Sequence, residues 1–219
     1  QIDDVPGISV PTYRGTGAGN RFEQHCLDRL VNEGKAGKGQ FNRYGVQVRI
    51  TGEDPLTGQP ILQSVKSFPD IEGLLATGTQ AIFDCKVCSD TSLDLSRYRI
   101  GDEKSGSKEK QLRHMVEKAD YGAVCGFVVH WNDRKTKSKA EPSETFWFPV
   151  HRQIPFWIQF WRLEIKRLNR DHCRELGVPV RWNKLTSRSR ASPDLYEVMN
   201  NLDQRSQPKR APRMLGSWQ

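Results

Sequence analysis

Charged residues stand at both ends of a short apolar segment in the first half of the chain. Asp70 precedes the sequence IEGLLATGTQAIF, and Asp84, Cys85 and Lys86 follow it directly. Charges beside a buried strand are unfavourable unless they are paired or bind a metal ion. The segment is therefore a candidate functional site.

The motif consists of Pro-Asp, then thirteen residues, then Asp-x-Lys. These residue types in this order suit the hydrolysis of a phosphodiester. The carboxylates of Asp70 and Asp84 are ligands that Mg²⁺ prefers, with Mn²⁺ as a substitute, and they leave room for water and a phosphate oxygen. Asp84 and Lys86 lie two apart on a strand and so face the same side. Lys86 can then orient water beside the metal, and the backbone carbonyl of Cys85 is a further candidate ligand.

Other interpretations of this pattern stay open. An exposed Asp84–Lys86 ion pair at a strand end would stabilise the fold little and do no chemistry. Glu72 is a substitute ligand if the local register differs, and His114 and His130 are the other candidate general bases.

The cysteines offer a competing chemistry. Cys85 and Cys88 form a CxxC, which suits a redox centre or half of a zinc site, but no second CxxC or HxxxH occurs. On a strand the two side chains would face opposite sides. The chain has an odd number of cysteines, and we interpret them as buried, reduced thiols, which are typical of an intracellular protein. They are Cys26, Cys85, Cys88, Cys125 and Cys173.

Composition favours a polyanionic partner. Apolar residues make up 36% of the 219 residues and charged residues 27%, and the formal net charge of +8 points to nucleic acid ahead of an acidic membrane. No run of about 18 apolar residues is present, so we expect no membrane span. Without a signal-peptide pattern, we expect cytoplasm or nucleoid. The first residue is Gln1, so the native N-terminus is expected to be missing, which leaves an organelle open.

Three regions are predicted. Residues 1–19 are rich in Gly, Pro and Thr and predict an extended arm, and residues 20–180 form the main domain. Residues 181–219 are polar, with eight Lys or Arg against three acids, and predict a basic tail.

Within the domain, hydrophobic periodicity predicts an α/β fold with a mixed central sheet flanked by helices. Asn20 is the expected cap of the first helix, and the polar stretch 88–110 is an expected loop of functional length. The expected helices are 21–33, 108–120 and 154–176, and the expected strands are 44–50, 61–67, 122–131 and 145–150.

This order of motifs resembles the PD-(D/E)xK nuclease superfamily, and within it the RecU-type Holliday junction resolvases. The resemblance covers about residues 20–168 and is strongest from 68 to 162. The segments that carry it are DIEG, FDCK, TSLDLSRYRI, KEKQLRHM, GAVCGFVVHW and TFWFPVHRQIPFWIQFW.

The resemblance implies a restriction-endonuclease-like fold and a homodimer that uses Mg²⁺ to cut branched DNA, such as four-way junctions, in recombination and repair. Asp70, Asp84 and Lys86 match the catalytic positions, and Gln111 matches a glutamine that supports the site or the water. Glu23 would be the first-helix acid. Three departures matter: Asp84 stands where the family usually has Glu, the 87–110 loop is longer, and the segment after 180 has no match.

DNA contacts are expected from basic side chains on the arm, the second helix and the tail. The alternatives are a restriction- or mobile-element-type nuclease that cuts duplex DNA, and a DNA-binding protein of the same fold without catalysis. The expected contacts are Arg14, Arg21, Lys108, Lys110, Arg113, Arg188, Arg190, Lys209 and Arg210.

Overall fold

The computed structural model describes residues 10–43, 47–65, 69–98, 106–135, 140–183 and 191–206. A six-stranded sheet forms its centre, in the order β1-β4-β5-β7-β10-β12. The pair β5–β7 is parallel and the other pairs are antiparallel, so the sheet is mixed. The strands are β1 (Gly39–Arg43), β4 (Ile71–Leu75), β5 (Gln80–Cys88), β7 (Val124–Trp131), β10 (Glu144–Pro149) and β12 (Val178–Pro179).

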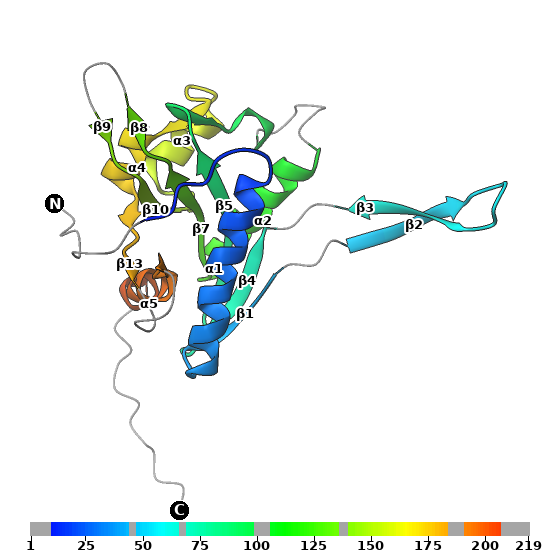
Figure 1. Ribbon diagram of the computed structural model, residues 1–219, viewed down its shortest axis with the longest axis horizontal. Helices are drawn as coiled ribbons and strands as arrows, with labels where there is room; N and C mark the ends of the chain where they lie inside the picture. Colours follow the sequence, from blue (N-terminus) through cyan, green and yellow to red (C-terminus); the bar gives the residue numbers. More distant parts are fainter. Residues whose placement is uncertain are drawn as a thin grey trace, which may run out of the picture.

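Helices cover both faces of this sheet (Figure 1). α1 (Ala18–Lys35) and α5 (Leu195–Ser206) pack on one face. α2 (Gly106–Asp120), α3 (Pro155–Trp161) and α4 (Arg170–Leu176) pack on the other. The predicted α/β class, a mixed central sheet flanked by helices, is confirmed.

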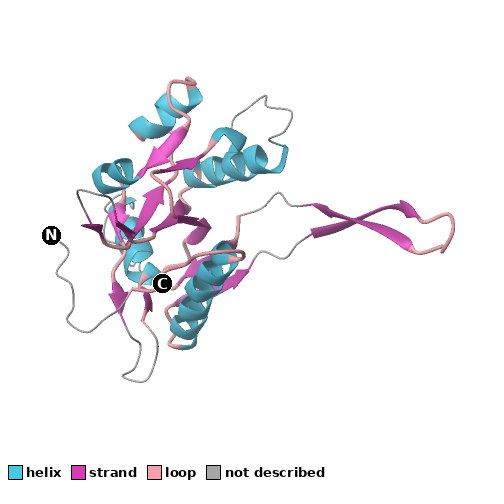
Figure 2. Cartoon of the chain, turned by 45° about the horizontal axis from the view of Figure 1, so that its top comes forward, coloured by secondary structure: helices cyan, strands magenta, loops and turns pink. Residues whose placement is uncertain are grey.

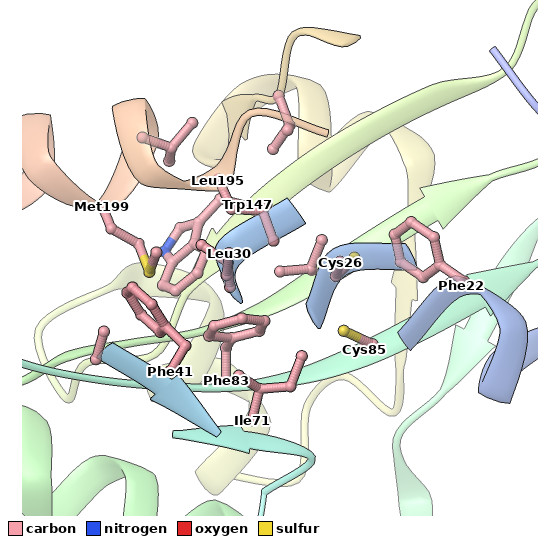
Figure 3. Close-up of a cluster of buried hydrophobic side chains, with 14 of the residues drawn as sticks. Phe22, Cys26, Leu30, Phe41, Ile71, Phe83, Cys85, Trp147, Leu195 and Met199 are labelled. Carbon is pink, nitrogen blue, oxygen red and sulfur yellow. The ribbon is translucent and has the colours of Figure 1, made fainter. Parts of the chain in front are cut away.

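Two cores result, one on each face. Phe83 and Cys85 of β5 point into the first core with Phe22 and Leu30 of α1 (Figure 3). Ile82 points into the second core. All eight residues of β7 are buried, because helices cover both of its faces.

A separate hairpin, β2 (Gln47–Glu53) with β3 (Pro60–Val65), projects from the body (Figures 1 and 2). In the turn that joins these strands, the side chain of Asp54 accepts the backbone N–H groups of Leu56 and Thr57. The expected strands 44–50 and 61–67 belong to this hairpin and not to the main sheet. Their residues 44–46 and 66–67 lie outside the described part.

The predicted basic tail is wrong for residues 181–183 and 191–206. These residues form β13 (Trp182–Asn183), β14 (Ser192–Pro193) and α5, and Leu195 and Met199 are fully buried in the first core. α5 has apolar residues at helical spacing, but the polar residues around them dominate the average composition of this region. Composition alone therefore did not indicate the helix.

The predicted N-terminal arm is wrong for residues 10–19. Residues 18 and 19 begin α1, which the left-handed Gly17 precedes, so Asn20 lies inside the helix and does not cap it. Tyr13 is buried, and the side chain of Asn132 holds its backbone: Tyr13 N–H donates to Asn132 Oδ1 at 2.8 Å, and Asn132 Nδ2 donates to Tyr13 O.

The expected helix 154–176 is broken into two. α3 ends where Leu163 adopts φ 65°, and the N–H groups of Leu163 and Glu164 donate to the carbonyls of Phe160 and Gln159 at 3.1 and 3.0 Å. This is the Schellman pattern of a helix end. The chain then forms β11 (Arg167–Asn169) before α4 begins.

β11 pairs with β6 (Ser92–Asp94), which is followed by η1 (Ser96–Tyr98). The expected loop 88–110 therefore contains regular structure, and α2 begins within it. A short pair, β8 (Arg134–Lys135) and β9 (Ala140–Glu141), follows β7. No helix in the described ranges is long and apolar enough to cross a membrane.

Candidate active site

Strand pairing explains the thirteen-residue spacing of the sequence motif. β4 and β5 are antiparallel with Ile71 opposite Phe83, so Asp70 at the start of β4 lies beside Asp84 and Cys85 of β5. Asp70 Oδ2 accepts the backbone N–H of Cys85 at 2.8 Å. The two ends of the motif therefore meet in the fold.

Asp84 is fully buried, and one of its two carboxylate oxygens contacts two donor groups. The ammonium of Lys86 forms an ion pair with Asp84 Oδ2, so the two side chains share a face as predicted. The Tyr98 hydroxyl donates to the same Oδ2 at 2.9 Å. Asp84 Oδ1 has no hydrogen bond from an N–H or hydroxyl group of the described residues, and the Asp84 side chain also bonds to the carboxyl group of Asp70. A buried carboxylate with one oxygen open to such donors, beside a second carboxyl group, is suited to bind a cation.

The two carboxyl groups have opposite pKa shifts. Burial, with the charge of Asp84 next, raises the pKa of Asp70 to about 8. Burial also acts to raise the pKa of Asp84, but the charge of Lys86, a side-chain hydrogen bond with Asp70 and the charge of Lys108 outweigh it, so that pKa lies below its usual range. Burial acts to lower the pKa of Lys86, but Asp84 outweighs it and the pKa is raised. Lys86 is thus an ammonium at neutral pH.

Gln111 of α2 is almost fully buried near these groups, as the sequence motif implies. Lys108 donates to Gln111 Oε1 at 2.9 Å, and its ammonium lies 5.6 Å from the centre of the Tyr98 ring. The charge of Lys108 contributes to the low pKa of Asp84. Lys108 therefore belongs to the site itself.

Glu23 of α1 also reaches this region. Its Oε1 pairs with Arg43 Nε at 2.6 Å, and its charge contributes to the raised pKa of Asp70. All five predicted catalytic residues are thus brought into one neighbourhood.

The residues present fit a hard divalent cation. Asp84 Oδ1 is open, Asp70 lies beside it, and the Cys85 carbonyl accepts from Lys86 Nζ at 3.2 Å, which places that carbonyl at the site. Across the described ranges, no three His, Cys, Asp or Glu side chains gather as a metal site. A cation here would take two carboxylates, the carbonyl and outside oxygens, as Mg²⁺ does.

The remaining polar candidates have other contacts. Glu72 accepts from Gln80 Nε2 at 2.6 Å, and buried His130 bonds Thr145 Oγ1 at 2.8 Å. Cys85 and Cys88 point into different cores, which confirms the predicted opposite faces. Burial raises the pKa of both thiols.

The predicted DNA contacts are spread over several environments. Arg14 pairs with Asp133 at 3.1 Å, and Arg21 donates to the Arg14 carbonyl at 2.7 Å. On α2, Lys110 is exposed and Arg113 pairs with Glu109 at 2.7 Å. The predicted contacts outside the described residues are Arg188, Arg190, Lys209 and Arg210.

Tyr98 is the site residue that sequence reasoning missed. It lies in the polar segment SRYRI, where its being the lone aromatic residue was the available signal in the sequence. Its ring packs edge-on against Phe127 at 5.4 Å, which fixes the direction of the hydroxyl.

No protein-family profile matches this chain, and no curated protein matches it. Among solved structures, the chain is similar to Hjc of Archaeoglobus fulgidus, a Holliday junction resolvase from an archaeal hyperthermophile. The TM-score is 0.37 and the sequence identity 16%, over 74% of this chain and 95% of that chain.

Proposed function

We propose that this chain is a metal-dependent endonuclease that hydrolyses phosphodiester bonds in branched DNA. The observation that carries the proposal is the buried Asp84 carboxylate with one open oxygen, beside Asp70 and Lys86. Repulsion between these two carboxyl groups helps to raise the pKa of Asp70 to about 8, and a divalent cation would relieve that repulsion in place of the proton.

Asp70, Asp84 and the Cys85 carbonyl would hold Mg²⁺, and Mn²⁺ would substitute. When bound, the cation supplies charge that polarises a phosphodiester and makes water a better nucleophile. Lys86, charged at neutral pH, acts as a hydrogen-bond donor that orients water or a phosphate oxygen and not as a base. Gln111, held by Lys108, borders the same space and would support the water.

Branched DNA is the preferred substrate class because the segments DIEG and FDCK follow one another as in RecU-type resolvases. A four-way junction has two equivalent strands, so a two-fold homodimer would place two sites on them. Three aromatic side chains of α3 are not available to that interface, because Phe156, Trp157 and Phe160 are buried against the subunit's own sheet.

The test is cleavage of labelled four-way junction, flap, duplex and single strand with Mg²⁺, Mn²⁺ or EDTA. We expect paired, symmetric nicks in the junction with either metal and none with EDTA, from a protein that is a dimer by light scattering. Cleavage confined to plain duplex would favour a restriction-type enzyme. If the protein bound DNA but cleaved none of these substrates with either metal, only the DNA-binding function would remain.

A further inference from the structure

The carboxylate of Asp84 is not symmetric in its surroundings. Oδ2 receives two donors, the Tyr98 hydroxyl at 2.9 Å and the Lys86 ammonium. Oδ1 receives no N–H or hydroxyl donor from the described residues, although the side chain is fully buried next to the carboxyl group of Asp70. The protein thus saturates one oxygen and leaves the other open.

Asp70 also has one oxygen held by a backbone donor. Its Oδ2 accepts the backbone N–H of Cys85 at 2.8 Å, and that donor belongs to the strand that carries Asp84. One oxygen of each carboxylate is therefore held by a fixed donor. Mg²⁺ demands near-ideal octahedral geometry, and donors that fix the rotation of its carboxylate ligands meet that demand in advance.

We propose that Tyr98 is a positioning residue of this site: its hydroxyl fixes the rotation of the Asp84 carboxylate so that Oδ1 faces the cation. The inference rests on the proposed function, because it assumes that Asp84 binds a metal.

The hydroxyl itself is rigidly placed. The Tyr98 ring lies edge-on to Phe127 of β7, with Lys108 above it, and Tyr98 N–H donates to the Leu95 carbonyl at 2.9 Å. Leu95 N–H donates in turn to the Lys166 carbonyl at 3.0 Å, so the segment is anchored to the chain beyond α3. A buried ring with a tethered backbone cannot swing its hydroxyl away from Asp84.

Tyr98→Phe removes only the hydroxyl and keeps the ring contacts. The matched control is Tyr121→Phe, because Tyr121 is 90% exposed after α2. Binding of Mn²⁺ to the purified, DNA-free protein is measured by electron paramagnetic resonance, and thermal unfolding is measured in EDTA. A second readout is the Mg²⁺ concentration that gives half-maximal cleavage.

We expect Tyr98→Phe to weaken Mn²⁺ binding about tenfold, the lower end of what removal of a ligand-orienting partner causes. Half-maximal cleavage should need correspondingly more Mg²⁺, while the unfolding temperature in EDTA stays near that of the control. Unchanged or tighter Mn²⁺ binding would overturn the inference, as would a lower unfolding temperature with unchanged affinity.

The two proposals fail in different ways. If the unaltered protein binds no Mn²⁺, or if Asp84→Asn binds it equally well, the metal site and the Tyr98 role both fall. If the unaltered protein binds Mn²⁺ through Asp84 and Tyr98→Phe binds it equally well, only the role of Tyr98 falls.

Discussion

Arg29 of α1 and Asp194, just before α5, form an ion pair of 3.4 Å between Nη2 and Oδ2, although 165 positions separate them in the chain. The Arg29 guanidinium also pairs with Glu33 at 2.7 Å and donates to Asn183 Oδ1 at 2.7 Å. Its side chain is 4% exposed. Removing one member of a buried ionic network leaves uncompensated charge inside the protein. The C-terminal segment is therefore part of the fold.

Ending the chain after residue 180 should abolish cooperative unfolding. The deletion uncovers the first core, where each large apolar side chain contributes about 2–5 kcal/mol, and leaves Arg29 without Asp194. Thermal unfolding followed by circular dichroism checks this, with a chain ended after residue 206 as the control. A chain ended at 180 that melts cooperatively at nearly the same temperature would contradict it.

The chain ended after residue 206 also tests the predicted phosphate contacts of Lys209 and Arg210. Contacts of basic side chains with phosphates carry no sequence information. We expect weaker binding to every DNA form, with a log–log salt slope flatter by about 0.9 for each phosphate that the shortened chain no longer neutralises. An identical slope would show that residues 207–219 do not touch DNA.

Asp70→Asn, Asp84→Asn and Lys86→Ala should each reduce metal-dependent cleavage by at least about a hundredfold, the effect of removing one group that stabilises reaction charge. DNA binding should persist in the two Asp→Asn variants, because removing a carboxylate charge reduces repulsion of phosphate. Glu117→Gln on α2 is the control. Single-turnover cleavage and binding titrations on one junction separate the two effects, and full activity of Asp84→Asn would refute the site.

His130 should make the protein acid-labile. Burial, together with Arg170, lowers its pKa from 6.5 to about 4 in the folded state. Smaller opposing effects come from Asn132, the Pro11 carbonyl and Asp133. Between pH 6.5 and 4 the unfolded chain binds a proton that the folded protein does not, so stability falls as pH falls through this window, by up to about 3 kcal/mol.

Urea unfolding of the His130→Gln variant from pH 7 to 4 tests this expectation. The variant should be less stable at pH 7 but should lose less stability on acidification than the unaltered protein. Gln153→Ala, at an exposed position after β10, should keep the original pH dependence because it changes no titratable group. Equal pH slopes for all three proteins would show that His130 does not titrate in this range.

Leu163→Gly should stabilise the protein. Leu163 is 60% exposed and has φ 65°, a conformation that costs a residue with a Cβ about 1 kcal/mol and that glycine adopts freely. We expect a gain of about 0.5–1 kcal/mol in urea unfolding. Gln159→Gly, at an exposed position inside α3, should instead lose about 1 kcal/mol. A decrease in stability at position 163 would mean that the Leu163 side chain stabilises the helix end.

The sequence revealed the parts of the site that strand geometry dictates. Asp84 and Lys86 share a face because side chains alternate along a strand, and Asp70 joins them because two antiparallel strands bring the ends of the motif together. Tyr98 was not predictable in the same way. Its contact with Asp84 depends on β6 pairing with β11, which lies more than seventy residues further along the chain.

The errors in the fold have the same cause. Apolar spacing from residue 154 onwards predicts one helix, but the chain leaves the helix at Leu163 and forms β11, which pairs with β6. The short helix α5 lies in a basic, polar region whose average composition predicts a tail. Local patterns identified most elements, whereas β11 and Leu195 take their places through contacts with distant parts of the chain.

The first core joins Tyr13 near the beginning of the chain to Met199 near its end. Because a ribosome makes the chain from its N-terminus, the partners of Leu30 in α5 emerge only after some 170 further residues, which takes roughly ten to thirty seconds. During that time the apolar face of α1 lacks part of its cover, and such surfaces attract chaperones or one another. The final closure of this core therefore follows synthesis of nearly every element, including the strands that carry Asp70 and Asp84.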